Sequence, residues 1–122
     1  MLNHVTLMGR LTKDPELRYT ASETPVATFT VACDRGFSKN ETDFINCVSW
    51  RKTAEFISKY FRKGSMIAIS GRLQVRSWKT EEGNTRSMTE VVVENAYFGE
   101  SKKTDVVSNF SEIDDDDGEL PF

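Results

Sequence analysis

A single change of hydrophobic period constrains the fold of this 122-residue chain more than any other feature. Apolar and polar residues alternate, as in a strand with one buried face, over residues 5–11, 26–34, 44–50, 66–78 and 87–98. Between the third and fourth of these segments, residues 53–61 place apolar side chains at helical spacing instead. The pattern therefore predicts three strands, one helix and two strands.

That order is typical of the oligonucleotide-binding (OB) fold, a five-stranded, partly open Greek-key barrel. We expect an all-β OB-fold barrel with one helix between its third and fourth strands. Thr53 is the predicted N-cap of the helix, and Gly64 is predicted to close it. The helix residues expected to plug the barrel are Phe56, Ile57, Tyr60 and Phe61. Gly9 interrupts the first strand and indicates a bulge or a bend.

Charge divides the chain into two parts. Seven of the 19 acidic residues lie beyond residue 103, where no Lys or Arg occurs. Residues 1–103 therefore carry a net charge of +4, and residues 104–122 a net charge of −7. The acidic part has too few apolar residues to fold alone. We expect an OB-fold domain over 1–103 and a disordered acidic tail over 104–122, an asymmetry typical of nucleic-acid-binding proteins with an interaction tail.

The fourth predicted strand has two chemically distinct faces. Its apolar face, expected to point inward, consists of Ile67, Ile69, Gly71, Leu73 and Val75. The opposite face carries Arg72, Arg76 and Trp78, a combination suited to phosphate attraction and base stacking. In the third strand, Phe44 and Trp50 lie opposite the apolar face. Taken alone, large aromatics more often belong to a packed layer, but outward aromatics on two neighbouring strands favour a binding surface.

Residues 34–43 are polar and are predicted to form a hairpin loop. Arg35 and Phe37 lie within it. Phe37 can stack on a base or fold back onto the barrel, and the sequence leaves both possibilities open.

No constellation of catalytic or metal-binding residues is recognisable. Cys33 and Cys47 both lie in apolar runs without CxxC spacing, and we expect two buried free thiols. The acidic residues of the body are expected to be scattered over turns and strand ends. We therefore expect no enzymatic activity, no cofactor and no metal, and no apolar run is long enough to span a membrane.

These residues resemble the bacterial and phage single-stranded-DNA-binding protein family. In the body the resemblance is carried by residues 3–19 (NHVTLMGRLTKDPELRY), 50–55 (WRKTAE), 62–65 (RKGS), 69–73 (ISGRL) and 89–93 (TEVVV). At the end of the chain it is carried by Asp114, Asp115, Asp116, Asp117, Leu120, Pro121 and Phe122, which are similar to the family's acidic tip.

The resemblance implies a cytoplasmic, nucleoid-associated homotetramer that coats single-stranded DNA in DNA replication, recombination and repair. It assigns base stacking to Phe37, Phe44, Trp50 and Trp78, with Arg35, Arg72 and Arg76 beside them, and recruitment of partner proteins to the tip. About ten residues separate Thr104 from the tip, where the family often has a long Gly/Gln/Pro-rich linker. A competence-specific paralogue or a phage-encoded protein is therefore as compatible with the sequence as the main replicative version.

Three other classes remain as alternatives. An OB-fold accessory protein needs no acidic Pro-Phe terminus, and an RNA-binding cold-shock-like module would be shorter and without this tail. A nuclease would need a cluster of metal-binding carboxylates in the body.

Overall fold

The computed structural model describes residues 1–99, without the side chains of Ser38 and Lys39. The predicted tail, residues 104–122, lies outside the described residues. The elements are β1 (Val5–Leu11), β2 (Glu16–Tyr19), β3 (Pro25–Arg35), β4 (Ser38–Trp50), α1 (Arg51–Tyr60), β5 (Met66–Lys79) and β6 (Thr85–Phe98).

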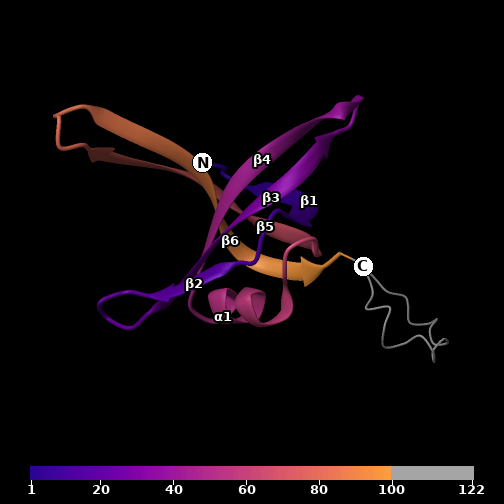
Figure 1. Cartoon of the computed structure of the whole chain (residues 1–122), viewed down its shortest axis with the longest axis horizontal. Helices are drawn as coiled ribbons and strands as arrows, with labels where there is room; N and C mark the ends of the chain where they lie inside the picture. The colour runs from indigo at the N-terminus through magenta and orange to yellow at the C-terminus, as the bar shows by residue number, and fades with distance from the viewer. Residues whose placement is uncertain (100–122) are drawn as a thin grey trace.

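Five of the strands close into a barrel. The sheet order is β1-β5-β6-β4-β3-β2, and an additional pairing of β1 with β3 completes the ring. All pairings are antiparallel except that of β4 with β6. The predicted five-stranded OB barrel with one helix is therefore confirmed (Figure 1). The short β2, which pairs with β3 outside the ring, was not predicted, because four residues with one half-buried apolar side chain leave little periodic signal.

The barrel interior is filled by alternate residues of the strands and by one side of α1. Its buried members include Leu11, Phe29, Val31, Cys47, Ile57, Phe61, Ile67, Ile69, Val91 and Val93. Of the four predicted plug residues, Ile57 and Phe61 are fully buried and Phe56 packs against the core. Tyr60 is about half-exposed, so its assignment to the plug is wrong. It lies instead at the barrel's outer end, against the rings of Phe56 and Phe98.

The ends of the helix differ from the prediction. Helix α1 begins at Arg51, directly after β4, with Trp50 as its N-cap residue. Thr53 therefore lies inside the helix, where its hydroxyl donates to the carbonyl oxygen of Glu94 at 3.5 Å. Arg51 adopts a φ of 57°, a left-handed conformation that turns the chain from strand to helix without a loop. Gly64 lies beyond the helix end, and its N–H donates to the carbonyl oxygen of Leu11.

Two long hairpins, β3–β4 and β5–β6, extend away from the barrel (Figure 1). In β5, Ile67, Ile69 and Gly71 are buried, but Leu73 and Val75 are 46% and 63% exposed. The prediction that all five form an inner face is thus wrong beyond Gly71. The reason is that the hairpin leaves the barrel next to the register shift at Ser70/Gly71, so both faces of β5 meet solvent beyond Gly71.

The other hairpin is also more extended than predicted. Its strands continue to Arg35 and resume at Ser38, so the predicted loop over residues 34–43 is a tight turn around Gly36 and Phe37. The strands are polar there because both faces of a protruding hairpin meet solvent, and polarity alone suggested a loop.

The remaining expectations concern Gly9 and the thiols. Gly9 is required for close packing, because a Cβ there would collide with the carbonyl oxygen of Ala32. Cys47 is a buried free thiol whose pKa is raised to about 12, chiefly by burial. Cys33 is only half-buried, so the expectation of a second buried thiol is wrong; burial, Asp43 and Asp34 raise its pKa.

Candidate nucleic-acid interface

The outer faces of β4, β6 and β5 form one continuous surface, which we call the candidate face. In the sheet register Val48 of β4 lies beside Val92 of β6, and Val92 lies opposite Arg72 of β5. Residues of matching parity therefore share this surface. It includes Phe44 and Trp50 from β4, Glu90 from β6, and Arg72, Gln74, Arg76 and Trp78 from β5.

The aromatic side chains predicted to point outward do so in the single chain. Phe44 is 66% exposed, and Trp50 and Trp78 are each 44% exposed. Phe37 is fully exposed at the tip of the β3–β4 hairpin and does not fold back onto the barrel. Exposing four large rings is unfavourable in water, and such rings are typical of binding surfaces. Their contacts with DNA remain predictions.

Each of the three predicted DNA-binding arginines is paired with carboxylates. Arg35 donates to both oxygens of Asp43, at 2.9–3.2 Å, and to Glu41 at 2.9 Å. The Nε of Arg72 lies 3.8 Å from Glu94. The Nε of Arg76 donates to Glu90 at 2.9 Å. A phosphate that binds one of these arginines must therefore either displace its carboxylate partner or bind the arginine alongside it.

These acidic partners were not predicted, because sequence reasoning placed the body's acidic residues on turns and strand ends. Glu90 and Glu94 lie inside β6 on the candidate face, and Asp43 lies inside β4. Counting equal numbers of residues back from the predicted strand ends, residues 78 and 87, would have placed Val91 opposite Gln74, one residue away from the observed register, in which Glu90 is opposite Gln74. Sequence polarity without that register does not show which face an acid shares.

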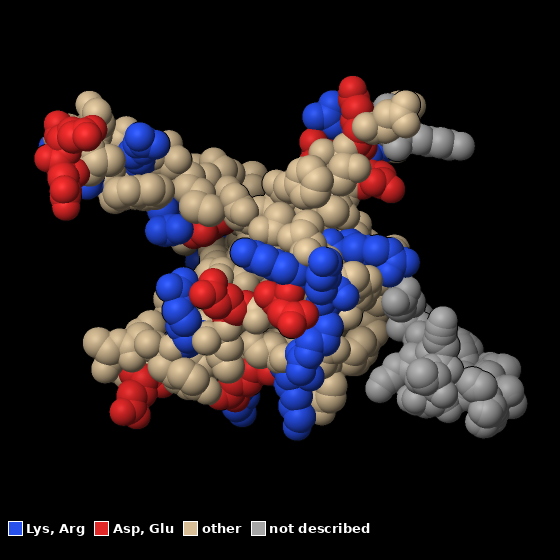
Figure 2. All heavy atoms as spheres, in the orientation of Figure 1, with Lys and Arg blue, Asp and Glu red and all other residues tan. Residues whose placement is uncertain are grey.

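The distribution of charge differs between the hairpins and the body. Figure 2 shows the two hairpins rising on either side of an open hollow, with both acidic and basic side chains toward their outer ends. A band of basic side chains runs down the body below the β3–β4 hairpin. On this face the basic band offers a polyanion a continuous path, whereas charges of both signs are mixed toward the hairpin ends.

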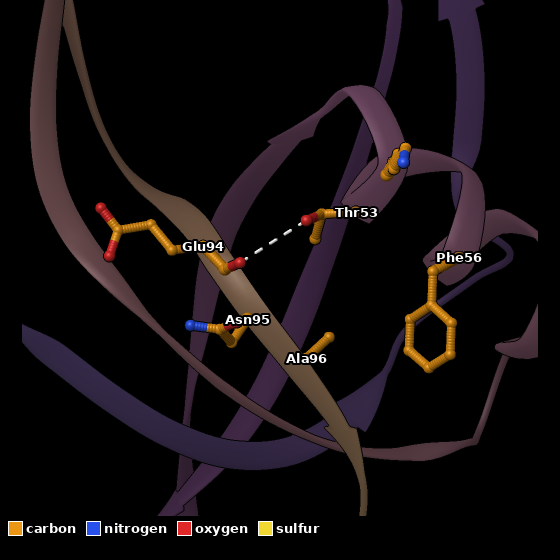
Figure 3. A pocket seen from close by; sticks show the side chains of 6 residues that line it. Thr53, Phe56, Glu94, Asn95 and Ala96 are labelled. Atoms are coloured by element: carbon orange, nitrogen blue, oxygen red, sulfur yellow. Dashed lines mark hydrogen bonds between the residues drawn. The ribbon is translucent and has the colours of Figure 1, made fainter.

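Two open pockets flank the start of α1. One is lined by Lys52, Thr53, Phe56, Glu94, Asn95 and Ala96 (Figure 3). The other adjoins the turn between β2 and β3 and is lined by Glu23, Thr24, Pro25, Trp50, Arg51, Lys52, Thr53 and Glu55. Arg51 and Lys52 thus line the same pocket as Trp50, and they add two cations next to the candidate face. In the sequence these two residues stood out only as part of the family resemblance.

Among residues 1–99, no helix is long and apolar enough to cross a membrane. The predicted partner-binding residues, Asp114 to Asp117 and Leu120 to Phe122, lie outside the described residues.

Comparisons with known proteins agree with the fold and with the motifs. The model of the single-strand binding protein family matches residues 2–99. A single-stranded DNA-binding protein of Enterococcus faecalis is 51% identical over 106 residues, which are 84% of this chain and 56% of the relative. Single-stranded DNA-binding protein A of Bacillus subtilis is 49% identical over 84% of this chain and 62% of its own length.

Some relatives are longer than this chain and others are matched throughout. The chain spans less than two thirds of the Enterococcus and Bacillus proteins. Single-stranded DNA-binding protein 1 of Streptococcus pyogenes is 45% identical, and the match covers all of both chains. Since the family model covers all of the described barrel and both hairpins, this chain belongs to the single-strand binding protein family.

Proposed function

We propose that the chain binds single-stranded DNA without regard to sequence, and so protects it during replication, recombination and repair. The observation that carries this proposal is the candidate face, where exposed aromatic rings alternate with arginines on adjoining strands. Family membership and the names of the relatives support it.

Stacking supplies the preference for single strands. Phe44, Trp50 and Trp78 present flat apolar surfaces to solvent, and every base has a π-face that can cover them. Each stacked base contributes about 1–3 kcal/mol, a range measured on proteins of this kind. Duplex DNA buries those base faces between its own pairs, so it cannot use these rings.

The arginines supply attraction to the phosphates. Arg72 and Arg76 lie on the same face of β5 as Trp78, and Arg51 and Lys52 line the same pocket as Trp50. Neutralising phosphates releases condensed counterions, so affinity falls as salt rises. Neither interaction reads base edges, which accounts for binding without sequence preference.

The assembly is proposed to be a homotetramer. Beside the candidate face, the outer side of β1, β5 and β6 carries Met8 and Tyr97, which are 56% and 54% exposed, in one row with Ala68. An apolar row on a sheet face is well suited to packing against a second copy. Light scattering would give four times the chain mass, and Met8→Glu with Tyr97→Glu would lower it.

The tail is proposed to be a disordered segment that recruits replication, recombination and repair proteins in the cytoplasm, at the nucleoid. The sequence supports this with four consecutive aspartates followed by Leu120, Pro121 and Phe122. Replacing Leu120, Pro121 and Phe122 by alanine removes the apolar part of the tip, and should abolish partner capture in a pull-down without changing DNA affinity. A variant that retains all wild-type partners would contradict the recruitment role.

The DNA-binding proposal is tested by titrating the protein with oligo(dT) while recording tryptophan fluorescence. Stacking should quench Trp50 and Trp78, and duplex DNA of equal length should quench far less. Equal affinity for duplex DNA, or a marked preference for RNA of the same sequence, would instead favour an accessory or RNA-binding OB protein. Strand cleavage during the titration would indicate a nuclease.

A further inference from the structure

Glu90 occupies an unexpected position for an acidic residue. It is 5% exposed, and it is the one buried charged residue among the side chains that the structure describes. It lies opposite Gln74, on the same face as Arg76 and Trp78. A carboxylate there repels phosphates, and its burial is costly unless it is paired and hydrogen-bonded. A residue in this position needs a role that offsets both effects.

The contacts of Glu90 converge on Arg76. Its Oε2 accepts from Nε of Arg76 at 2.9 Å and from Nε2 of Gln74 at 3.1 Å, and its Oε1 accepts from Nη2 of Arg76 at 3.5 Å. The guanidinium carbon lies 5.5 Å from the ring centroid of Trp78. The same Nη2 lies 3.5 Å from the sulfur of Met88. Arg76 is thus held between a fixed carboxylate and a ring, and within residues 1–99 its Nη1 makes no hydrogen bond.

We propose that Glu90 is a positioning residue for single-stranded DNA: it holds Arg76 against Trp78, so that a cation and a stacking ring meet one nucleotide as a preformed unit. This inference rests on the proposed function. A free arginine loses considerable rotamer entropy when it binds, whereas one that is already immobilised loses little. Glu90 repels the phosphate weakly, because Arg76 already balances its charge.

The neighbouring Glu94 provides a matched control. It lies on the same strand and the same face, but its side chain is 54% exposed and 3.8 Å from Arg72. Glu90→Gln and Glu94→Gln each remove one negative charge from a surface that binds a polyanion. On charge alone, both should tighten binding to oligo(dT).

The proposal predicts opposite results for the two variants. Glu94→Gln should tighten binding at low salt and converge on wild type near 1 M salt, where the Debye length is about 3 Å. Glu90→Gln should weaken binding about threefold to tenfold, because the Arg76 side chain must then be ordered when DNA binds. The lower affinity should persist at high salt. If Glu90→Gln tightens binding as Glu94→Gln does, the proposal is overturned.

A double-mutant cycle separates positioning from general damage to the fold. In an Arg76→Ala background, Glu90→Gln should cause no further weakening, because the residue through which Glu90 acts is gone. Equal losses in both backgrounds would overturn the proposal. In a Trp50→Phe background, Glu90→Gln should also shift the emission of Trp78 in the free protein. Should Glu90→Gln fail to fold, Arg76→Lys, which keeps the charge and loses the planar fork, must reproduce the weakening.

Arg76→Ala and Trp78→Ala test DNA binding by the candidate face separately from the positioning role of Glu90. If Arg76→Ala and Trp78→Ala both leave oligo(dT) affinity unchanged, the candidate face is wrong, and the positioning role is wrong with it. If both variants weaken binding while Glu90→Gln does not, the face stands and Glu90 has no positioning role.

Discussion

The two long hairpins carry similar side chains and organise them differently. In β5–β6, Arg76 pairs with Glu90, whose side chain is 6% exposed, and lies over the ring of Trp78. In β3–β4, Arg35 pairs with Asp43, whose side chain is 48% exposed, and Phe37 stands fully exposed at the tip. Exposed ion pairs hold their geometry weakly, whereas a buried carboxylate fixes its partner. An arginine, a carboxylate and an aromatic ring therefore form one preformed unit in β5–β6, whereas in β3–β4 the ion pair and the ring are separate.

The position of the backbone irregularity also differs. The register shift of β5–β6 lies at its root, between Ser70 and Gly71. That of β3–β4 lies near its tip, between Asp34 and Arg35. A shift at the root sets the angle at which the whole hairpin leaves the barrel, whereas one near the tip affects a few residues.

The largest expected effect follows from this difference. A Cβ at Gly71 would collide with the carbonyl oxygen of Val92, whereas a Cβ at Gly36 would meet no atom. Gly71→Ala should lower the free energy of unfolding by about 1–3 kcal/mol, the usual cost of overpacking, and Gly36→Ala should leave it nearly unchanged. Urea denaturation of both variants measures the two values. Equal values would mean that the root of β5–β6 is not the more constrained site.

The aromatic rings should differ in their effect on DNA binding. Trp78→Ala should weaken oligo(dT) binding by about one to two orders of magnitude, since it removes a stacking surface and the ring that Arg76 contacts. Phe37→Ala should weaken it by less, because Phe37 contacts nothing that orders it in the free protein. Fluorescence anisotropy of labelled oligo(dT), with circular dichroism to confirm folding, gives both affinities. A larger loss for Phe37→Ala would reverse the comparison.

The contrast also shows what sequence can and cannot predict here. The barrel was predictable because strand and helix periods depend on burial inside it, and Phe29, Ile57 and Ile69 obey that rule. Beyond Gly71 both faces of β5 meet solvent, so the apolar residues Leu73 and Val75 gave a false inner face. Likewise Thr53 is a good cap by composition, but tertiary placement starts the helix at Arg51.

Within the candidate face, the outward aromatics were predictable from alternation, whereas the ion pairs were not. Which carboxylate meets which arginine depends on the register between β5 and β6 and on the shift at Ser70/Gly71. Alternation within one strand carries no information about that register. Glu90 and Glu94 therefore emerged only from the structure.

The arginines should differ in how much each contributes to the salt dependence of DNA binding. Arg72→Ala with Arg76→Ala should reduce the slope of log affinity against log salt, by about 0.7 for each phosphate of the single strand that is no longer neutralised. Arg35→Ala should change it less, because Arg35 is paired with two carboxylates, Asp43 and Glu41, whereas Arg72 and Arg76 are each paired with one. Titrations at several salt concentrations give the slopes. An unchanged slope for the double variant would remove Arg72 and Arg76 from the phosphate path.

The smallest effect concerns the pH response of the tip pair in β3–β4. The hydrogen bond from Arg35, together with its charge, lowers the pKa of Asp43 below its usual value of 3.8. A carboxyl with a lowered folded pKa contributes its stabilisation fully above the unfolded pKa and loses it as pH falls through the folded pKa. Arg35→Ala should therefore return the pKa of Asp43 toward its usual value, and the stability difference between this variant and wild type should shrink in strong acid.

An NMR titration of the Asp43 carboxyl carbon in wild type and Arg35→Ala measures the shift directly. Glu41 also bonds Arg35, so Glu41→Gln serves as the control and should leave most of the shift in place, because the hydrogen bond and the charge of Arg35, which this variant keeps, are what lower the pKa of Asp43. Both groups of the pair are exposed, so the pair stabilises the hairpin tip weakly and DNA affinity near neutral pH should not change. Identical titration curves for Asp43 with and without Arg35 would show that the tip pair does not persist in solution, and would sharpen the contrast with the buried pair of β5–β6.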